Sequence, residues 1–151
     1  MNEFWRRHAN PWSVWTRFAA IPAVIMAVWS RSWLGWWALL PVAVVVVWLV
    51  INPIAFRPVH QPTAWVSKAV YGQQIWLTQR DQVPVEYRTI LRWLVALGIA
   101  GLLFIAWGLW TLDVWPTMYG GTLVVFSQFW QLDRQSLLCD ELKAKLKASQ
   151  M

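Results

Sequence analysis

Three side chains in this sequence could form a site that acts on a phosphate-bearing substrate. His8 could serve as a general base, or as a ligand to haem or a pigment, because a neutral imidazole accepts protons and binds metals. Asp133 and Arg134 stand together near the end of an apolar run, where they could bind or act on a lipid headgroup. Each also has a structural interpretation, which we favour. His8 is then a surface histidine, and Asp133 is an ion-pair partner of Arg7 or Arg17 that joins the last apolar segment to the first.

Other kinds of site chemistry are poorly supported. The two histidines, His8 and His60, lack the spacing of metal ligands, and the single cysteine, Cys139, can form neither an internal disulfide nor a cysteine cluster. The sequence contains no glycine-rich phosphate loop, nucleophile elbow, kinase motif or zincin motif. We therefore expect no metal and no cofactor.

The basic residues favour binding to anionic lipid. The net charge is +6, which in a soluble protein would suggest nucleic acid as a partner. Basic residues that flank apolar segments instead face anionic headgroups, so we expect no nucleic-acid partner. The residues that we expect to contact lipid headgroups or a partner protein are Arg6, Arg7, Arg17, Lys68 and Arg134.

The elements that must position these residues are membrane helices. Hydrophobic residues make up 58% of the 151 residues and charged residues 13%, against about 25% charged in soluble domains. The run from Ser32 to Ile51 carries no charge, and a helix of that length rises about 30 Å, the thickness of the hydrocarbon layer. The uncharged run from Trp93 to Leu112 predicts a second span in the same way.

We therefore expect an all-α integral membrane protein that forms one domain over residues 1–151. Four transmembrane helices, arranged as two hairpins, are predicted at about 12–30, 33–51, 93–112 and 116–132. An interfacial amphipathic helix at about 63–77 lies between the second and third spans, and a cytoplasmic helical tail follows at 134–148. Because the uncharged part of the first span is short, an interfacial or re-entrant hairpin remains an alternative there.

Small residues and prolines predict the details of these helices. Asn10-Pro11 and Asn52-Pro53 are typical of caps and turns, while Pro41 and Pro22 should kink their helices. Alanines at four-residue intervals predict seams for close helix packing. They are Ala19, Ala23 and Ala27 in the first span, and Ala96 and Ala100 in the third, with Gly98, Gly101 and Gly108 nearby.

Charge and tryptophan predict the orientation. Of the 13 lysines and arginines, only Arg31 falls outside the two termini and the middle segment. The positive-inside rule then places both termini and the middle segment in the cytoplasm. The fifteen tryptophans fall near the ends of the predicted spans, where an indole ring finds both apolar contacts and water.

Four motifs carry a resemblance: FWRRHANPWSVWTR at 4–17, INPIAFRP at 51–58, AVYGQQIWL at 69–77 and FWQLDR at 129–134. Together they resemble a family of small prokaryotic multi-pass membrane proteins, known as a domain of unknown function. The resemblance implies a four-helix protein of the prokaryotic inner membrane and supplies no activity. The family pattern has glutamate in place of Gln73 and lysine in place of Gln128. We therefore predict that these two amides touch and replace an ion pair.

Three functions stay open. The leading one is a non-enzymatic accessory or scaffolding subunit, held to anionic lipid, to a larger complex or to a second copy. The second is an enzyme acting on a lipid or isoprenoid at the cytoplasmic interface, with His8, Asp133 and Arg134 in one pocket. The third is a small transporter or a pigment-binding subunit.

Overall fold

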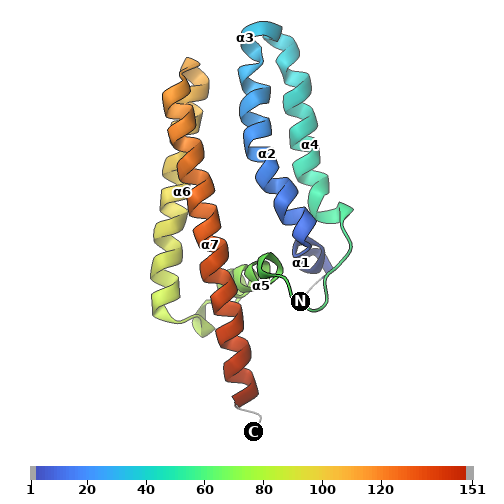
Figure 1. The fold of residues 1–151 in the computed structure, drawn as a ribbon, viewed down its shortest axis with the longest axis vertical. Coiled ribbons are helices and arrows are strands. Elements are labelled where there is room, and N and C mark those ends of the chain that lie inside the picture. Colours follow the sequence, from blue (N-terminus) through green and yellow to red (C-terminus); the bar gives the residue numbers. More distant parts are fainter. Residues whose placement is uncertain (1–2, 149–151) are drawn as a thin grey trace.

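The computed structural model describes residues 3–148, except for the side chains at 146 and 147, and this part of the chain is helical without strands (Figure 1). The α-helices are α1 (Glu3–His8), α2 (Pro11–Trp29), α3 (Arg31–Leu34), α4 (Leu39–Ala55), α5 (Trp65–Thr78), α6 (Val85–Thr111) and α7 (Val114–Ala148). Two 3₁₀ turns, η1 (Gly35–Ala38) and η2 (Arg80–Gln82), complete the order.

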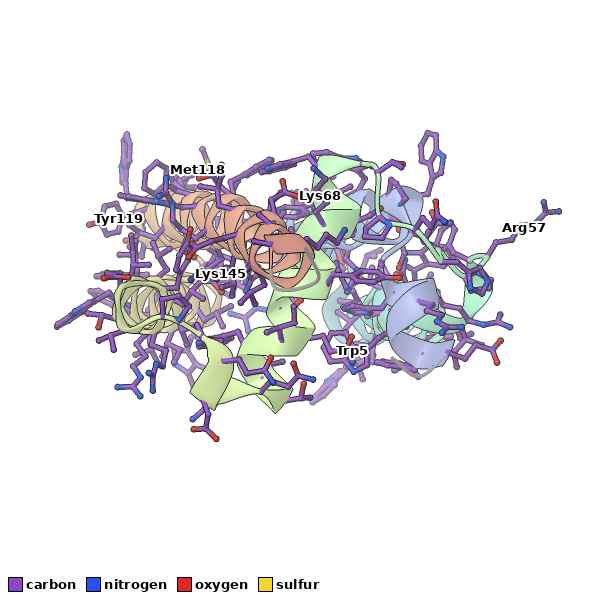
Figure 2. All side chains as sticks on the ribbon, turned by 90° about the horizontal axis from the view of Figure 1, so that it is seen from below. Trp5, Arg57, Lys68, Met118, Tyr119 and Lys145 are labelled. Carbon is purple, nitrogen blue, oxygen red and sulfur yellow. The ribbon has the colours of Figure 1, made fainter. Side chains whose placement is uncertain are left out.

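The long helices form two hairpins, as predicted. Helices α2 and α4 lie side by side, and so do α6 and α7 (Figure 1). Helix α5 runs across the base of the molecule, and the view from below shows it between the two hairpins (Figure 2). The predicted fourth span and tail are one continuous helix, α7, which extends beyond α5.

Two helical stretches are long and apolar enough to cross a membrane. They cover 11–55, which folds back on itself as the α2–α4 hairpin, and 85–111, which is α6. The core helix of a soluble protein can pass the same test, but such a helix is mostly buried. Here only 6% and 28% of the most apolar windows are buried, so the apolar side chains face outward.

The predicted second span is interrupted. The chain forms α3 and the turn η1 before α4 starts at Leu39, and the break falls at Gly35, whose φ of +54° is a conformation that glycine adopts readily. Pro41 lies in the first turn of α4, where a missing N–H has no partner to lose, so it does not interrupt the helix and the kink predicted there is wrong. A kink at Pro22, inside α2, stays a prediction.

The end of α4 also differs from the prediction. The helix passes through Asn52 and Pro53 and ends at Ala55, and extended backbone begins at Phe56. The fully buried side chain of Asn52 is bonded to α2. These bonds hold the last turn helical, so Asn52-Pro53 is not the helix-ending motif that we expected.

Glycines bring α6 and α7 together. A Cβ added at Gly120 would lie 2.5 Å from the carbonyl oxygen of Gly101, and one at Gly108 would lie 2.5 Å from the amide nitrogen of Thr117. Of the predicted small-residue seam, Gly98, Gly101 and Gly108 are buried, whereas Ala96 is exposed and Ala100 half-buried. The close backbone approach requires residues without a Cβ, and these share the buried face of α6.

The seam predicted on α2 is also displaced. Ala19 is exposed and Ala23 half-buried, whereas Ala20 and Ala27 are buried together with Ser13. The side chain of Ser13 bonds to α4, which fixes the face that α2 turns toward its partner.

Helix α5 is present where an amphipathic helix was predicted, and Val66, Ala69 and Val70 of its apolar face are buried. The two ends of that face are not. Trp65 and Leu77 are exposed and Ser67 is buried. The reason is the crossing with α7: a Cβ at Gly72 would lie 1.9 Å from the carbonyl oxygen of Gln135. The core at this crossing consists of Ala9, Val14, Val66, Ala69, Val70 and Leu132.

Candidate functional site

The corner between α1 and α2 is built by Asn10. Its Oδ1 accepts a hydrogen bond from the backbone N–H of Trp12 (3.0 Å), and its Nδ2 donates to the carbonyl of Arg57 (3.1 Å). Pro11 is the first residue of α2. The cap predicted for Asn10-Pro11 is therefore confirmed, and it turns α1 back toward the second turn of α2.

Asn52 joins the two helices of the first hairpin. Its Oδ1 accepts from the hydroxyl of Ser13 (2.7 Å), and its Nδ2 donates to the hydroxyl oxygen of Thr16 (2.6 Å). Both functional groups of a fully buried amide are thus satisfied. Asn52 therefore has a structural role in holding α4 to α2.

His8 and Arg17 form a half-buried pair beside this network. The Arg17 Nε donates to the carbonyl of Ser13 (2.9 Å) and its Nη2 to the carbonyl of His8 (3.0 Å). Its Nη1 contacts both ring nitrogens of His8 and lies 2.9 Å from Nδ1. Burial, and then the positive charge of Arg17, lowers the pKa of His8 to about 4, so this histidine is neutral at pH 7. The pair carries a single positive charge.

That positive charge has no anionic partner within residues 3–148. The ion pairs in this part of the chain join Arg7 to Glu3, Lys68 to Asp140, Arg134 to Asp133 and Lys145 to Glu141. The predicted pair of Asp133 with Arg7 or Arg17 is therefore wrong. Asp133 is bonded to its chain neighbour at 3.0 Å, Arg7 to Glu3 one turn away at 2.7 Å, and Arg17 is turned toward His8.

A cavity of about 300 Å³ lies beside the His8–Arg17 pair. Its other polar lining comes from Gln73 of α5 and Gln128 of α7, and its apolar walls include Phe18. Within the described part of the chain, neither glutamine amide has a hydrogen-bond partner. The two amides share the cavity, as a pair would, but they do not form the hydrogen bond that was expected to replace an ion pair.

Two further cavities continue from the first along α2. One, of about 200 Å³, shares Arg17, Ile21 and Val124 with it, and the next, of about 380 Å³, shares Ile21 and Ile25 with the second. Their lining is almost entirely apolar, and the third reaches Thr117 near the start of α7. The seam between the hairpins is therefore hollow over several helical turns.

The far end of the seam is bridged by Arg31. Its Nη2 donates to the carbonyl oxygens of Leu109 (2.5 Å) and Trp110 (2.7 Å), in the last turn of α6. A cation at this position also suits the negative end of the helix dipole. The fourth cavity, of about 650 Å³, lies here, between Val28, Trp36 and Leu112.

The three residues proposed as catalytic are not brought together. His8 lines the first cavity, whereas Asp133 and Arg134 line none of the four. Within the described residues, no group of three or more His, Cys, Asp and Glu side chains could hold a metal ion. Of the residues expected to contact headgroups, Arg17 lines the cavity and Lys68 is paired at 2.9 Å, while Arg6 lies 3.4 Å from the ring of His60.

Sequence reasoning missed the contact between His8 and Arg17. A signal was available, because the cap and proline at Asn10-Pro11 predict a tight corner there. Such a corner turns the last residue of α1 toward the second turn of α2, which contains Arg17.

The motif segments at 4–17, 69–77 and 129–134 all contribute residues to the first cavity or its neighbouring walls. The chain belongs to DUF6653, a family of unknown function. The match to that family covers residues 1–151. No curated protein and no solved structure matches the chain. Function must therefore be argued from the geometry of this chain itself.

Proposed function

We propose that the chain is a multi-pass protein of a prokaryotic inner membrane, with four spans and with α5 and both termini in the cytoplasm. In this proposal it acts as a non-enzymatic accessory or scaffolding subunit. Its partners are anionic membrane lipids and either a larger membrane complex or a second copy of the chain.

The observation that carries the membrane placement is the distribution of exposed tryptophans. One band lies at the α3 end of the molecule, where Trp33, Trp36, Trp37, Trp110 and Trp115 are 72–87% exposed. A second band lies at the α5 end and comprises Trp12, Trp15, Trp48, Trp65, Trp93 and Trp130, all exposed. Along α6, the rise from Trp93 to Trp110 is about 26 Å, close to the hydrocarbon thickness of a bilayer.

The surface between the bands is apolar. On α4 the exposed side chains of this zone are Val44, Val46, Val47, Leu49 and Val50. Soluble monomers rarely expose a continuous apolar surface of this extent, because it would associate in water. Lipid chains around the bundle would cover this apolar surface and prevent such association.

The charges support the orientation. Arg31 lies at the α3 end and its guanidinium is bonded to carbonyls of α6. Arg57 follows the end of α4, Lys68 lies in α5 and Arg88 lies in the first turn of α6, and these segments are at the α5 end (Figure 1). Under the positive-inside rule this distribution favours a cytoplasmic α5.

The scaffolding role is supported by how the polar residues are used. Asn52, Arg7 and Lys68 each connect one helix or segment to another, through Ser13, the carbonyl of Ile54 (3.1 Å) and Asp140 respectively. Asp133 and Arg134, which an enzyme would place in a pocket, are bonded to each other.

Site-specific labelling tests the topology. In a Cys139→Ser background, single cysteines replace exposed Trp36 or exposed Thr78, and intact spheroplasts are treated with a membrane-impermeant maleimide. We expect Trp36→Cys to react at once and Thr78→Cys only after permeabilisation. The reverse pattern, or release of the protein from membranes by alkaline carbonate, would overturn the placement.

Native mass spectrometry from mild detergent tests the scaffolding role. We expect the chain to emerge with a partner subunit or as a defined oligomer. A protein that emerges as a monomer without any partner, at concentrations near those in the membrane, would contradict the role.

A further inference from the structure

The row of cavities along α2 has one polar end and a long apolar remainder. The polar end is formed by His8, Arg17, Gln73 and Gln128. The remainder is lined by aliphatic side chains of both hairpins, including Ile21, Ile25 and Val125. This division matches an amphiphile with a single polar head better than it matches a small polar solute.

The positive charge of Arg17 at the polar end favours an anionic ligand. Arg17 has no carboxylate partner within residues 3–148, and its carbonyl and imidazole contacts are with neutral groups. An arginine has five N–H donors, more than these contacts use. A half-buried guanidinium beside lipid chains is stabilised when a phosphate or carboxylate completes its bonding.

The two free amides add donors at the same place. Gln128 is exposed and lies in α7 between Val124 and Leu132, within the predicted fourth span, and no described group bonds to its side chain. Gln73 faces the same cavity from α5. In a membrane, an amide without a partner is unfavourable, so a headgroup that accepts from both would satisfy them.

The geometry points to a binding site for one anionic phospholipid, with its phosphate on Arg17, Gln73 and Gln128 and an acyl chain in the seam between α2 and the α6–α7 hairpin. This inference rests on the membrane placement proposed above. The lipid would fill the space between two hairpins that pack directly against each other only in part. It would thereby be a structural component of the fold.

Retention of defined lipid tests the site. The purified full chain in mild detergent is mixed with phosphatidylglycerol or phosphatidylcholine of the same acyl chains, and native mass spectrometry measures the fraction of chains that carry one lipid. We expect one phosphatidylglycerol to be retained in clear preference to phosphatidylcholine. Millimolar inorganic phosphate should not displace it, because the acyl chain contributes to binding; displacement by phosphate would overturn the lipid assignment.

Matched variants locate the lipid. Arg17→Gln should reduce retention about tenfold, the effect of losing one charge-assisted contact, whereas Arg57→Gln should leave it unchanged, because Arg57 extends away from the molecule (Figure 2). Gln128→Leu, at an exposed position, should reduce retention severalfold. Equal losses in Arg17→Gln and Arg57→Gln would indicate a general surface attraction and would overturn the site.

A steric variant tests the acyl part of the site independently of charge. Gly121 lines the third cavity, and a Cβ there would meet only Ile25 Cδ1, at 3.8 Å. Gly121→Leu should fill the cavity and reduce lipid retention. Carbonate extraction of the same variants separates the two proposals: a chain that stays in the membrane but retains no lipid overturns the site alone, and a chain released by carbonate overturns the membrane placement.

Discussion

The two hairpins are held together by different kinds of contact. In the α6–α7 hairpin the backbones approach so closely that a Cβ on Gly101 would lie 2.9 Å from the carbonyl oxygen of Gly120. In the α2–α4 hairpin the contact that stands out is polar, with Asn52 bonded to Ser13 and Thr16. Under the membrane placement proposed above, water exclusion cannot drive helices together, so close packing and buried hydrogen bonds are the available alternatives. This chain uses close packing in the α6–α7 hairpin and buried hydrogen bonds in the α2–α4 hairpin.

The difference also explains where the cavities lie. The helices of the glycine-packed hairpin approach each other closely at Gly101, Gly108 and Gly120, and three of the cavities lie where this hairpin meets α2. At the base α5 closes that seam by crossing α7 at Gly72, and at the far end Arg31 bonds to α6. The interior of the seam is therefore available to a ligand while both ends are fixed by the protein.

The largest expected effect comes from adding one methyl group to the glycine contact. Gly120→Ala places a Cβ 2.5 Å from the Gly101 oxygen and 2.6 Å from the Ile105 nitrogen, and neither backbone atom can move without shifting a helix. We expect the free energy of unfolding to fall by about 3 kcal/mol, measured by denaturation in detergent. The adjacent Gly121→Ala is the matched control and should be close to neutral. Equal effects at both positions would show that the close approach is not what holds this hairpin.

The polar hairpin should respond to the loss of a single amide. Asn52→Ala removes two hydrogen bonds and leaves the Ser13 hydroxyl buried, so we expect destabilisation of about 1–2 kcal/mol. Thr122→Ala is the control, because that exposed hydroxyl bonds only within its own helix, to the carbonyl of Met118 (2.9 Å).

Combining the two variants tests whether the hairpins are independent. If each is held by its own contact, the effects of Gly120→Ala and Asn52→Ala should add within about 0.5 kcal/mol. A coupling energy larger than about 1 kcal/mol would mean that the two contacts depend on each other, so that each hairpin is not held by its own contact alone.

The helix order and both hairpins could be predicted from the sequence, but the packed faces could not. Apolar runs and prolines mark the helices whatever surrounds them. On a helix that is apolar all around, however, the spacing of Ala19, Ala23 and Ala27 does not say which side meets protein and which meets lipid. The side chain of Ser13, whose partner is remote in sequence, selects the face.

The contacts within the candidate site could also be predicted only in part from the sequence. Which residues gather at the α5 end could be predicted, because topology and charge count decide it. The ion pairs among these residues could not be predicted. Asp133 could pair with its chain neighbour Arg134 or with a distant arginine, and it pairs with Arg134. The break at Gly35 was equally hidden, because the surrounding run is uniformly apolar.

The link at the far end of the seam should matter for geometry more than for stability. Arg31→Gln removes the bonds to Leu109 and Trp110, so the two hairpins should separate more freely there. Spin labels at Trp36→Cys and Trp115→Cys, in a Cys139→Ser background, should give a broader distance distribution in Arg31→Gln than in Arg57→Gln. An unchanged distribution would place the restraint elsewhere, in α5.

The smallest expected effect concerns protons. Burial and Arg17 lower the pKa of His8 to about 4, below the value of about 6.5 in an unfolded chain. Between these values the unfolded state binds more protons, so the His8 contribution is fully present above pH 6.5 and is lost as the pH falls toward 4. His8→Gln should therefore flatten the fall in Tm between pH 7 and pH 5, whereas His60→Gln, at an exposed position, should not. Saturating phosphatidylglycerol should also flatten it in part in the wild-type chain, because an anion beside Arg17 offsets the repulsion that adds to burial in lowering the pKa of His8. If phosphatidylglycerol leaves the slope unchanged, the bound lipid does not lie beside the His8–Arg17 pair. Any lipid in the seam would then contact its apolar side chains alone.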